Sequence, residues 1–240
     1  GAGPGQATIR LLVSSALPNR RGRLPDGRTA AARSRTRPSR RLPRRGQGRR
    51  TAGSSVDVRP GPETAIVVRE ARPDDLSAVA AVFLACWHDS YAGFLPPDVI
   101  GMYDEEGART LWRPALSDPP ADAVVLVAEQ AGRGILGVIR LGRDPDEPAT
   151  GHVYSLYVRP DTQGLGVGSR LLASGSDRIR RDGVHEATLW VFAANAAALG
   201  FYSRLGWQPD GGERVEPQYG EPELRLRRVL GDGSGSGRAE

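Results

Sequence analysis

Three glycines in five positions, Gly164, Gly166 and Gly168, constrain this chain more than any other feature. They follow an apolar segment over residues 152–158 and lead into a helical pattern that opens at Ser169. Glycine leaves backbone N–H groups unshielded and accepts positive φ, so several consecutive amides can face one ligand. Those amides are also the unpaired donors of a helix's first turn, where the helix dipole favours negative charge. The segment therefore predicts a strand, an anion-binding loop and a helix, with a diphosphate as the ligand.

The loop departs from both common nucleotide-binding patterns. A P-loop requires a Lys after its second glycine, and the chain contains no Lys. A dinucleotide fingerprint requires Gly-x-Gly-x-x-Gly with an acidic residue about 20 positions later, whereas the spacing here is Gly-x-Gly-x-Gly. Asp182 lies near that distance, but Arg181-Asp182-Gly183 is typical of a helix end. Both nucleotide-binding classes are therefore disfavoured.

The loop instead resembles the pyrophosphate loop of the GCN5-related N-acetyltransferases, the GNAT superfamily, because it reads Gln-x-x-Gly-x-Gly after a strand. The resemblance continues through a strand at 187–192, Asn195, an Ala-rich helix and the segment 199–207. It implies acetyl-CoA as the cofactor and transfer of an acetyl group to an amine, with no covalent enzyme intermediate. The residues that match the family's coenzyme-binding positions are Leu156, Tyr157, Val158, Gln163, Gly164, Leu165, Gly166, Val167, Gly168, Ser169 and Asn195.

The patterns between residues 63 and 230 alternate between strand and helix. Strands are predicted at 66–70, 123–129, 135–141, 152–158, 187–192 and 223–227, and helices at 75–90, 105–116, 169–183 and 195–205. The order β-α-α-β-β-β-α-β-α-β predicts an α/β fold, a mixed central sheet flanked by helices. It is also the order of the GNAT fold.

The charge distribution separates an N-terminal extension from this domain. Residues 1–50 hold 14 Arg and one acidic residue, so the other residues carry a net −8 from 19 Arg and 27 Asp or Glu. We expect residues 1–62 to form a disordered Arg-rich extension and residues 231–240 a flexible Gly/Ser tail. The extension is compatible with a transit peptide, with nucleic-acid binding or with no function, and the acidic domain argues against nucleic acid as the main partner.

The cysteine content and the hydropathy of the chain indicate the kind of cellular compartment in which it works. The chain has one Cys, which agrees with a cytoplasmic protein. No apolar run approaches the ~20 residues of a membrane helix. Three scattered His and the single Cys offer no zinc spacing. We therefore expect no membrane and no metal, with a small-molecule amine as the partner and a homodimer left open.

Tyr202 is the candidate general acid. It lies seven positions after Asn195, so the two side chains share one helix face, within ~20°. An Asn at a helix start is also explained by capping, and a Tyr beside Phe201 is also explained by core packing. The resemblance implies that Asn195 contacts coenzyme A and that Tyr202 lies near the thioester sulfur, where it protonates the departing thiolate.

The general base is less well defined. Many relatives carry a Glu in the central strand, but the middle of this strand reads Val153-Tyr154-Ser155. His152, which also fits a surface histidine, and Glu129 are the candidates, acting directly or through water.

The first helices are expected to wall the acceptor pocket. Trp87 and Tyr91 are i,i+4 neighbours that are expected to bind substrate or simply to pack. The acidic cluster 104–106 in the second long helix favours a cationic or neutral acceptor such as a polyamine or aminoglycoside, although it also fits compensation of the helix dipole. The alternatives are an N-terminal acetyltransferase of proteins or peptides and a non-catalytic acyl-CoA-binding protein.

Overall fold

A seven-stranded mixed sheet runs through residues 65–231, the part of the chain that the computed structural model describes. The predicted extension and all but the first residue of the predicted tail lie outside these residues. The sheet order is β1-β2-β3-β4-β5-β7-β6. The strands are β1 (Ile66–Glu70), β2 (Val124–Gln130), β3 (Gly134–Arg143), β4 (Gly151–Val158), β5 (Glu186–Phe192), β6 (Gln208–Val215) and β7 (Pro222–Val229).

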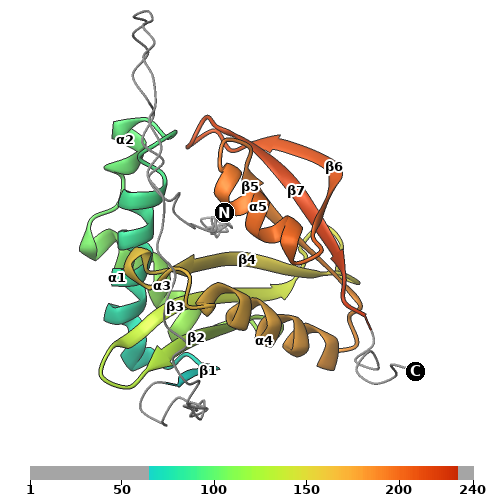
Figure 1. Cartoon of the computed structure of the whole chain (residues 1–240), viewed down its shortest axis with the longest axis horizontal. Helices are drawn as coiled ribbons and strands as arrows, with labels where there is room; N and C mark the ends of the chain where they lie inside the picture. Colours follow the sequence, from blue (N-terminus) through green and yellow to red (C-terminus); the bar gives the residue numbers. More distant parts are fainter. Residues whose placement is uncertain (1–64, 232–240) are drawn as a thin grey trace, which may run out of the picture.

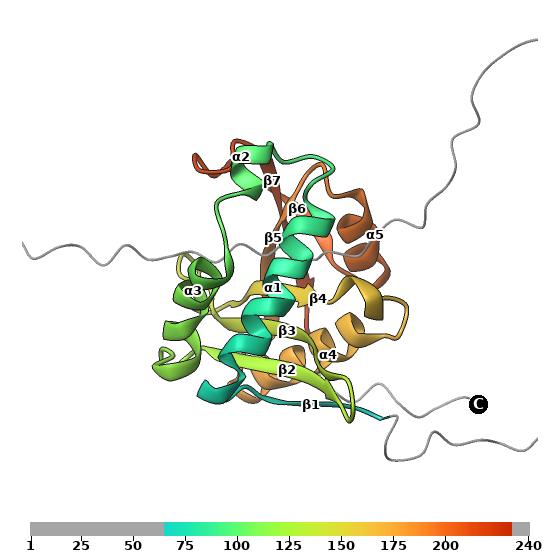
Figure 2. The same cartoon turned by 90° about the vertical axis from the view of Figure 1, so that its left-hand side faces the viewer.

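Helices cover both faces of the sheet (Figures 1 and 2). The helices α1 (Leu76–Ser90) and α3 (Glu105–Ser117) lie on one face, with the short α2 (Pro97–Ile100) beyond the end of α1. The helices α4 (Val167–Arg181) and α5 (Ala196–Arg204) lie on the other. None of the helices in the described part of the chain is long and apolar enough to cross a membrane.

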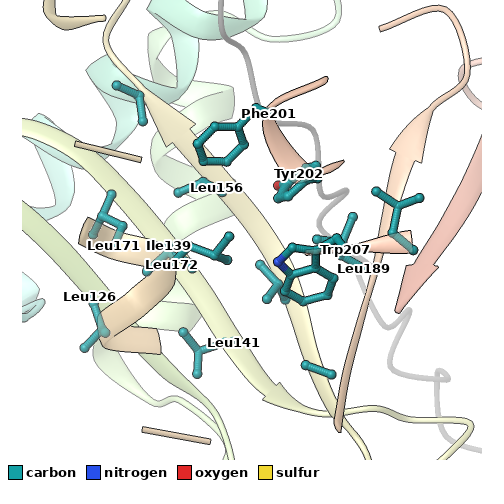
Figure 3. Close-up of a cluster of buried hydrophobic side chains, with 14 of the residues drawn as sticks. Leu126, Ile139, Leu141, Leu156, Leu171, Leu172, Leu189, Phe201, Tyr202 and Trp207 are labelled. Atoms are coloured by element: carbon teal, nitrogen blue, oxygen red, sulfur yellow. The ribbon is translucent and has the colours of Figure 1, made fainter. Parts of the chain in front are cut away.

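Each face of the sheet has its own apolar core because strand side chains alternate between the faces. In β4, Tyr157 packs with α1 and α3, whereas Leu156 and Val158 pack with α4 and α5. Figure 3 shows the second core, in which Leu156 lies with Phe201, Tyr202 and Trp207. The two cores hold the central strand from both sides.

The strands β4 and β5 are paired only over their first residues. Their parallel register ends at Val153 and Leu189, so β4 beyond Val153 pairs with β3 alone. Near the same point β4 contains a bulge. Arg140 of β3 opposes Ser155 and Leu141 opposes Val153, so Tyr154 is an extra residue in β4. Such a bulge bends a strand. The sheet therefore opens between the last residues of β4 and β5, beside the glycine loop.

The predicted α/β fold and element order are confirmed, with two omissions. Neither α2 nor β6 was predicted from the sequence. Residues 208–215 read Gln-Pro-Asp-Gly-Gly-Glu-Arg-Val, which lacks apolar alternation and contains the residues typical of turns. The strand forms because it is at the sheet edge, where β7 supplies its pairing across an irregular register between Pro209 and Glu213.

Candidate functional site

The glycine loop has the backbone that an anion site requires. Gly164 and Gly166 have φ of +81° and +75°, and Gly166 is the N-cap of α4. Side chains are strained in that region, so glycine is needed at both positions. A Cβ added at either one would meet nothing within 4 Å, which shows that both face open space. The first-turn amides of α4 therefore lie beside an open, unshielded loop.

A cavity of about 370 Å³ lies at this loop. Seven of the predicted coenzyme positions line it. These are Val158, Gln163, Gly164, Gly166, Val167, Gly168 and Ser169. Of the other predicted positions, Leu156 and Tyr157 are buried in β4 and Leu165 is 46% exposed. The loop residues and the end of β4 thus form one site.

Arg204 and Phe201 of α5 also line the cavity, and neither was predicted from the sequence to bind the coenzyme. An Arg in the last turn of a helix is ordinarily explained by the helix dipole, so its position alone gave no signal. In this structure Arg204 places its positively charged guanidinium beside the first-turn amides of α4. In addition, Nε2 of Gln163 is buried without a hydrogen-bond partner among the described residues. These donors fit a diphosphate.

The start of α5 is capped by Asn195. Its Oδ1 accepts a hydrogen bond from the Ala198 N–H at 3.0 Å, and the residue is 6% exposed. The capping role that the sequence left open is therefore real. A contact with coenzyme A stays a prediction.

Tyr202 is fully buried, with its ring 5.2 Å from that of Phe201 and 5.9 Å from that of Trp207. The pKa of Tyr157 is raised well above its ordinary value, first by burial and then by neighbouring groups that include Tyr202. Tyr157 belongs to the core on the α1 and α3 face and Tyr202 to the core on the α4 and α5 face, so the role of Tyr202 as the acid stays a prediction.

Neither of the two predicted bases lines the cavity at the glycine loop. His152 stands six residues before Val158, or ~20 Å along an extended strand. Glu129 lies two strands from β4 and forms an ion pair with Arg69, with Nε and Oε2 2.7 Å apart. Neither side chain is brought to the glycine loop, and their role as bases stays a prediction without geometric support.

His152 belongs instead to a buried polar cluster at the paired ends of β4 and β5. Its Nδ1 is 2.7 Å from Thr188 Oγ1, which donates to Asp144 Oδ2 at 2.5 Å. Burial acts to raise the pKa of Asp144, but hydrogen bonds from His152 and Thr188, among others, outweigh it and hold the pKa well below its usual range. The cluster stabilises the only segment where these strands pair.

Replacing Asp144 by Asn is therefore expected to lower the free energy of unfolding by about 3 kcal/mol at neutral pH, since it breaks a buried charged network. A carboxylate with a lowered pKa stabilises the fold above its ordinary pKa of ~3.9 and loses that contribution as the pH falls through the folded value. Urea unfolding at several pH values measures the difference. A difference that grows as the pH falls would contradict this assignment.

Trp87 and Tyr91 lie in an aromatic cluster on the α1 face. Their rings are 5.1 Å apart, edge to face, and Trp87 Nε1 donates to the Ile100 carbonyl at 2.9 Å. We define the aromatic cluster by its members Phe83, Trp87, Tyr91, Phe94, Tyr103, Tyr157, Phe192 and Tyr219. It joins α1 to the end of β5 and to the loop before β7.

Cys86 and the acidic cluster at the start of α3 have structural roles. Cys86 is buried and donates to the Val158 carbonyl at 3.0 Å, and burial raises the pKa of its thiol to about 12, so it is not a reactive thiol. Asp104 caps α3 by accepting from the Gly107 N–H at 2.7 Å, and Glu105 forms an ion pair with Arg109. Within residues 65–231, no group of three or more His, Cys, Asp or Glu could hold a metal ion.

Comparison with known proteins agrees with this geometry. The family model described as the acetyltransferase (GNAT) family matches residues 83–207, more than half of the chain. The chain therefore belongs to the GNAT acetyltransferase family, the family that its sequence resembles.

Two of the relatives match over a fraction of their length. Mycothiol acetyltransferase of Kocuria rhizophila is 36% identical over 92 residues, which are 37% of this chain and 30% of that protein. L-methionine sulfoximine/L-methionine sulfone acetyltransferase of Pseudomonas aeruginosa is 36% identical over 99 residues, 40% of this chain and 56% of that protein. The chain thus spans about a third and about half of these two relatives.

Among solved structures, PaiA N-acetyltransferase from Thermoplasma acidophilum in complex with coenzyme A has the same fold. It aligns with a TM-score of 0.55 at 20% identity and covers 69% of this chain and 99% of that one.

Proposed function

We propose that this chain transfers the acetyl group of acetyl-CoA to the primary amine of a small molecule, directly and within a ternary complex. One observation carries the proposal. The opening between β4 and β5 meets the anion loop on one side and the aromatic cluster on the other. A donor held at the loop and an acceptor held at the cluster would therefore meet at this opening, with Tyr202 as the candidate acid.

The chain's own groups account for each requirement of the transfer. The amides of the glycine loop, Gln163 and Arg204 would hold the diphosphate. Bound acetyl-CoA supplies an activated acyl thioester. Beyond Val153, β4 pairs with β3 alone, and a backbone N–H on its edge toward β5 would suit a developing oxyanion. Tyr202 would give its proton to the thiolate.

The acceptor must lose a proton before it reacts. A primary amine of pKa ~10.4 is protonated at pH 7, and its deprotonation costs about 4.6 kcal/mol. The two acetyltransferase relatives include one named for the small amino acid analogue methionine sulfoximine, which supports a small acceptor. The predictions of a cytoplasmic location and of a homodimer stay predictions.

The test is release of free thiol from acetyl-CoA in the presence of polyamines, aminoglycosides, amino acid analogues and acidic or basic peptides. We expect turnover with small amines. Turnover with peptides alone would favour an N-terminal acetyltransferase. Binding of acetyl-CoA without thiol release for any amine would favour a non-catalytic acyl-CoA-binding protein.

Deleting residues 1–60 is expected to leave kcat/KM within a few-fold of the full chain, because every group of the proposed site lies beyond residue 80. Steady-state kinetics on the best amine of the panel checks this. A loss of tenfold or more would assign a portion of the acceptor site to the deleted segment.

A further inference from the structure

Glu223 is a buried carboxylate beside the aromatic cluster, and the mechanism above does not use it. It is 0% exposed and lies directly opposite Phe192 in the antiparallel pair of β5 and β7. Directly opposed residues project to the same face of a sheet. Phe192 belongs to the aromatic cluster, with its ring 6.0 Å from that of Tyr219. Glu223 therefore projects from the face of the sheet that carries the aromatic cluster.

Only one oxygen of this carboxylate is satisfied within the described residues. Oε2 accepts from Arg214 Nε at 2.6 Å, whereas Oε1 is buried without a hydrogen-bond partner. Arg214 is itself held by Glu216 at 3.2 Å and by the face of Trp190, 4.3 Å from the ring centroid. The ion pair with Arg214 accounts for Oε2 alone. Oε1 needs a further partner, because burying a hydrogen-bond acceptor without one is costly.

The surroundings of Glu223 suit proton exchange near neutral pH. Burial outweighs the opposing effect of Arg214 and, with a smaller contribution from Glu216, raises the pKa of Glu223 to about 7. The pKa of Tyr219 is raised by burial, by Tyr103, by Tyr157 and by Glu223. The charged and titratable groups around Glu223 are thus Arg214, Glu216 and Tyr219.

We propose that Oε1 of Glu223 binds the ammonium group of the acceptor and takes its proton, while the aromatic cluster encloses the cation. This rests on the proposed function and deepens it, since it names the group that binds and deprotonates the acceptor. Aromatic faces attract a cation electrostatically, and a carboxylate provides the charged hydrogen bond. The three N–H donors of such a group supply the missing partner of Oε1.

The acetyl transfer can be written so that every proton and electron pair is accounted for. One N–H bond of the ammonium breaks and its proton forms an O–H bond with Oε1, which leaves a lone pair on nitrogen. That pair forms the N–C bond to the acetyl carbon, and the C–S bond breaks with its electrons on sulfur. Sulfur receives a proton from Tyr202, and the second proton lost from nitrogen restores the phenol. Glu223 then releases its proton to water, so the net products are the amide, the free thiol and one proton.

The test replaces Glu223 by Gln, which keeps the shape and removes the charge. We expect kcat/KM for the best amine of the panel to fall on the order of 10²-fold, with the Kd of acetyl-CoA unchanged. In the wild type, kcat/KM should rise as the pH rises through about 7, where Glu223 ionises, and the variant should lack this limb. Glu223→Asp, which keeps the charge, should recover some of the rate.

Glu216→Gln is the matched control, since it also removes a carboxylate from Arg214. It should stay within a few-fold of the wild type, with the limb shifted to lower pH because a neighbouring negative charge is gone. Circular dichroism and thermal unfolding report whether each variant is folded.

A readout without turnover uses carbon-13 NMR of Glu-labelled wild type, with the Gln variant identifying the Glu223 carboxyl signal. Its pKa near 7 should fall when n-butylammonium is added, because a nearby cation favours the ionised form, and n-butanol should have no effect.

Two outcomes separate the claims. Wild type that releases no thiol with any amine overturns the proposed function and this inference together. Active wild type with an unchanged Glu223→Gln variant, or no shift on adding n-butylammonium, overturns this inference and leaves the function standing.

Discussion

Replacing Tyr202 by Phe is expected to lower kcat by ~10²–10⁴ while the Kd of acetyl-CoA stays unchanged. The substitution keeps the ring, which packs between Phe201 and Trp207, and removes only the hydroxyl. A thiol of pKa ~8.5 is already a fair leaving group, so the lower end of the range applies where its departure is not rate-limiting. Steady-state kinetics and calorimetry give the two quantities.

The pH profile distinguishes acid catalysis from packing. A phenol that donates its proton should give the wild type a decline in kcat at high pH, and the Phe variant should lack that decline. Tyr154→Phe is a suitable control, because its hydroxyl donates to the Arg143 carbonyl outside the site. A Tyr202→Phe enzyme with wild-type kcat and pH profile would make Tyr202 a packing residue.

Replacing Gly166 by Val is expected to weaken acetyl-CoA binding by ~10²–10⁴-fold. Hydrogen bonds to charged groups contribute about 1.5–3 kcal/mol each, and the new side chain would keep the diphosphate from at least two amides. Gly168→Val should also weaken binding, but a Cβ there lies 3.3 Å from Phe201, so that variant also disturbs packing. Calorimetric titration with acetyl-CoA measures both.

Gly183 offers a matched control for the strain of this change. Its φ of +73° is close to the +75° of Gly166, and a Cβ there also meets nothing within 4 Å. It lies past the other end of α4, away from the cavity. Gly183→Val should therefore share the loss of stability but keep the affinity, and equal affinity losses in both variants would remove the claim that loop amides bind the coenzyme.

The glycine loop could be predicted from sequence because its requirements are local. The backbone conformation at Gly164 and Gly166 and the helix that follows depend on a few consecutive residues. The same holds for the start of α5 at Asn195. Local rules failed at β6, because its turn-forming residues become a strand only through pairing with β7.

Groups that come together through long-range pairing could not be found in this way. Arg204 reaches the loop because α5 packs beside α4, and Glu223 reaches the aromatic cluster because β7 pairs with β5. Each reads from sequence as an ordinary charged residue of a surface helix or an edge strand. Conversely, His152 stands near the loop in the linear sequence, but an extended strand separates them by ~20 Å.

The opening between β4 and β5 also determines how binding energy is distributed. The opening is present in the folded chain because of the bulge at Tyr154 and the two separate cores. Where the strands still pair, they are held together by the buried polar cluster of Asp144, His152 and Thr188. An incoming ligand therefore does not have to separate hydrogen-bonded strands. The site is preorganised at the expense of folding stability, and the free energy of ligand binding remains available for orienting the reacting groups.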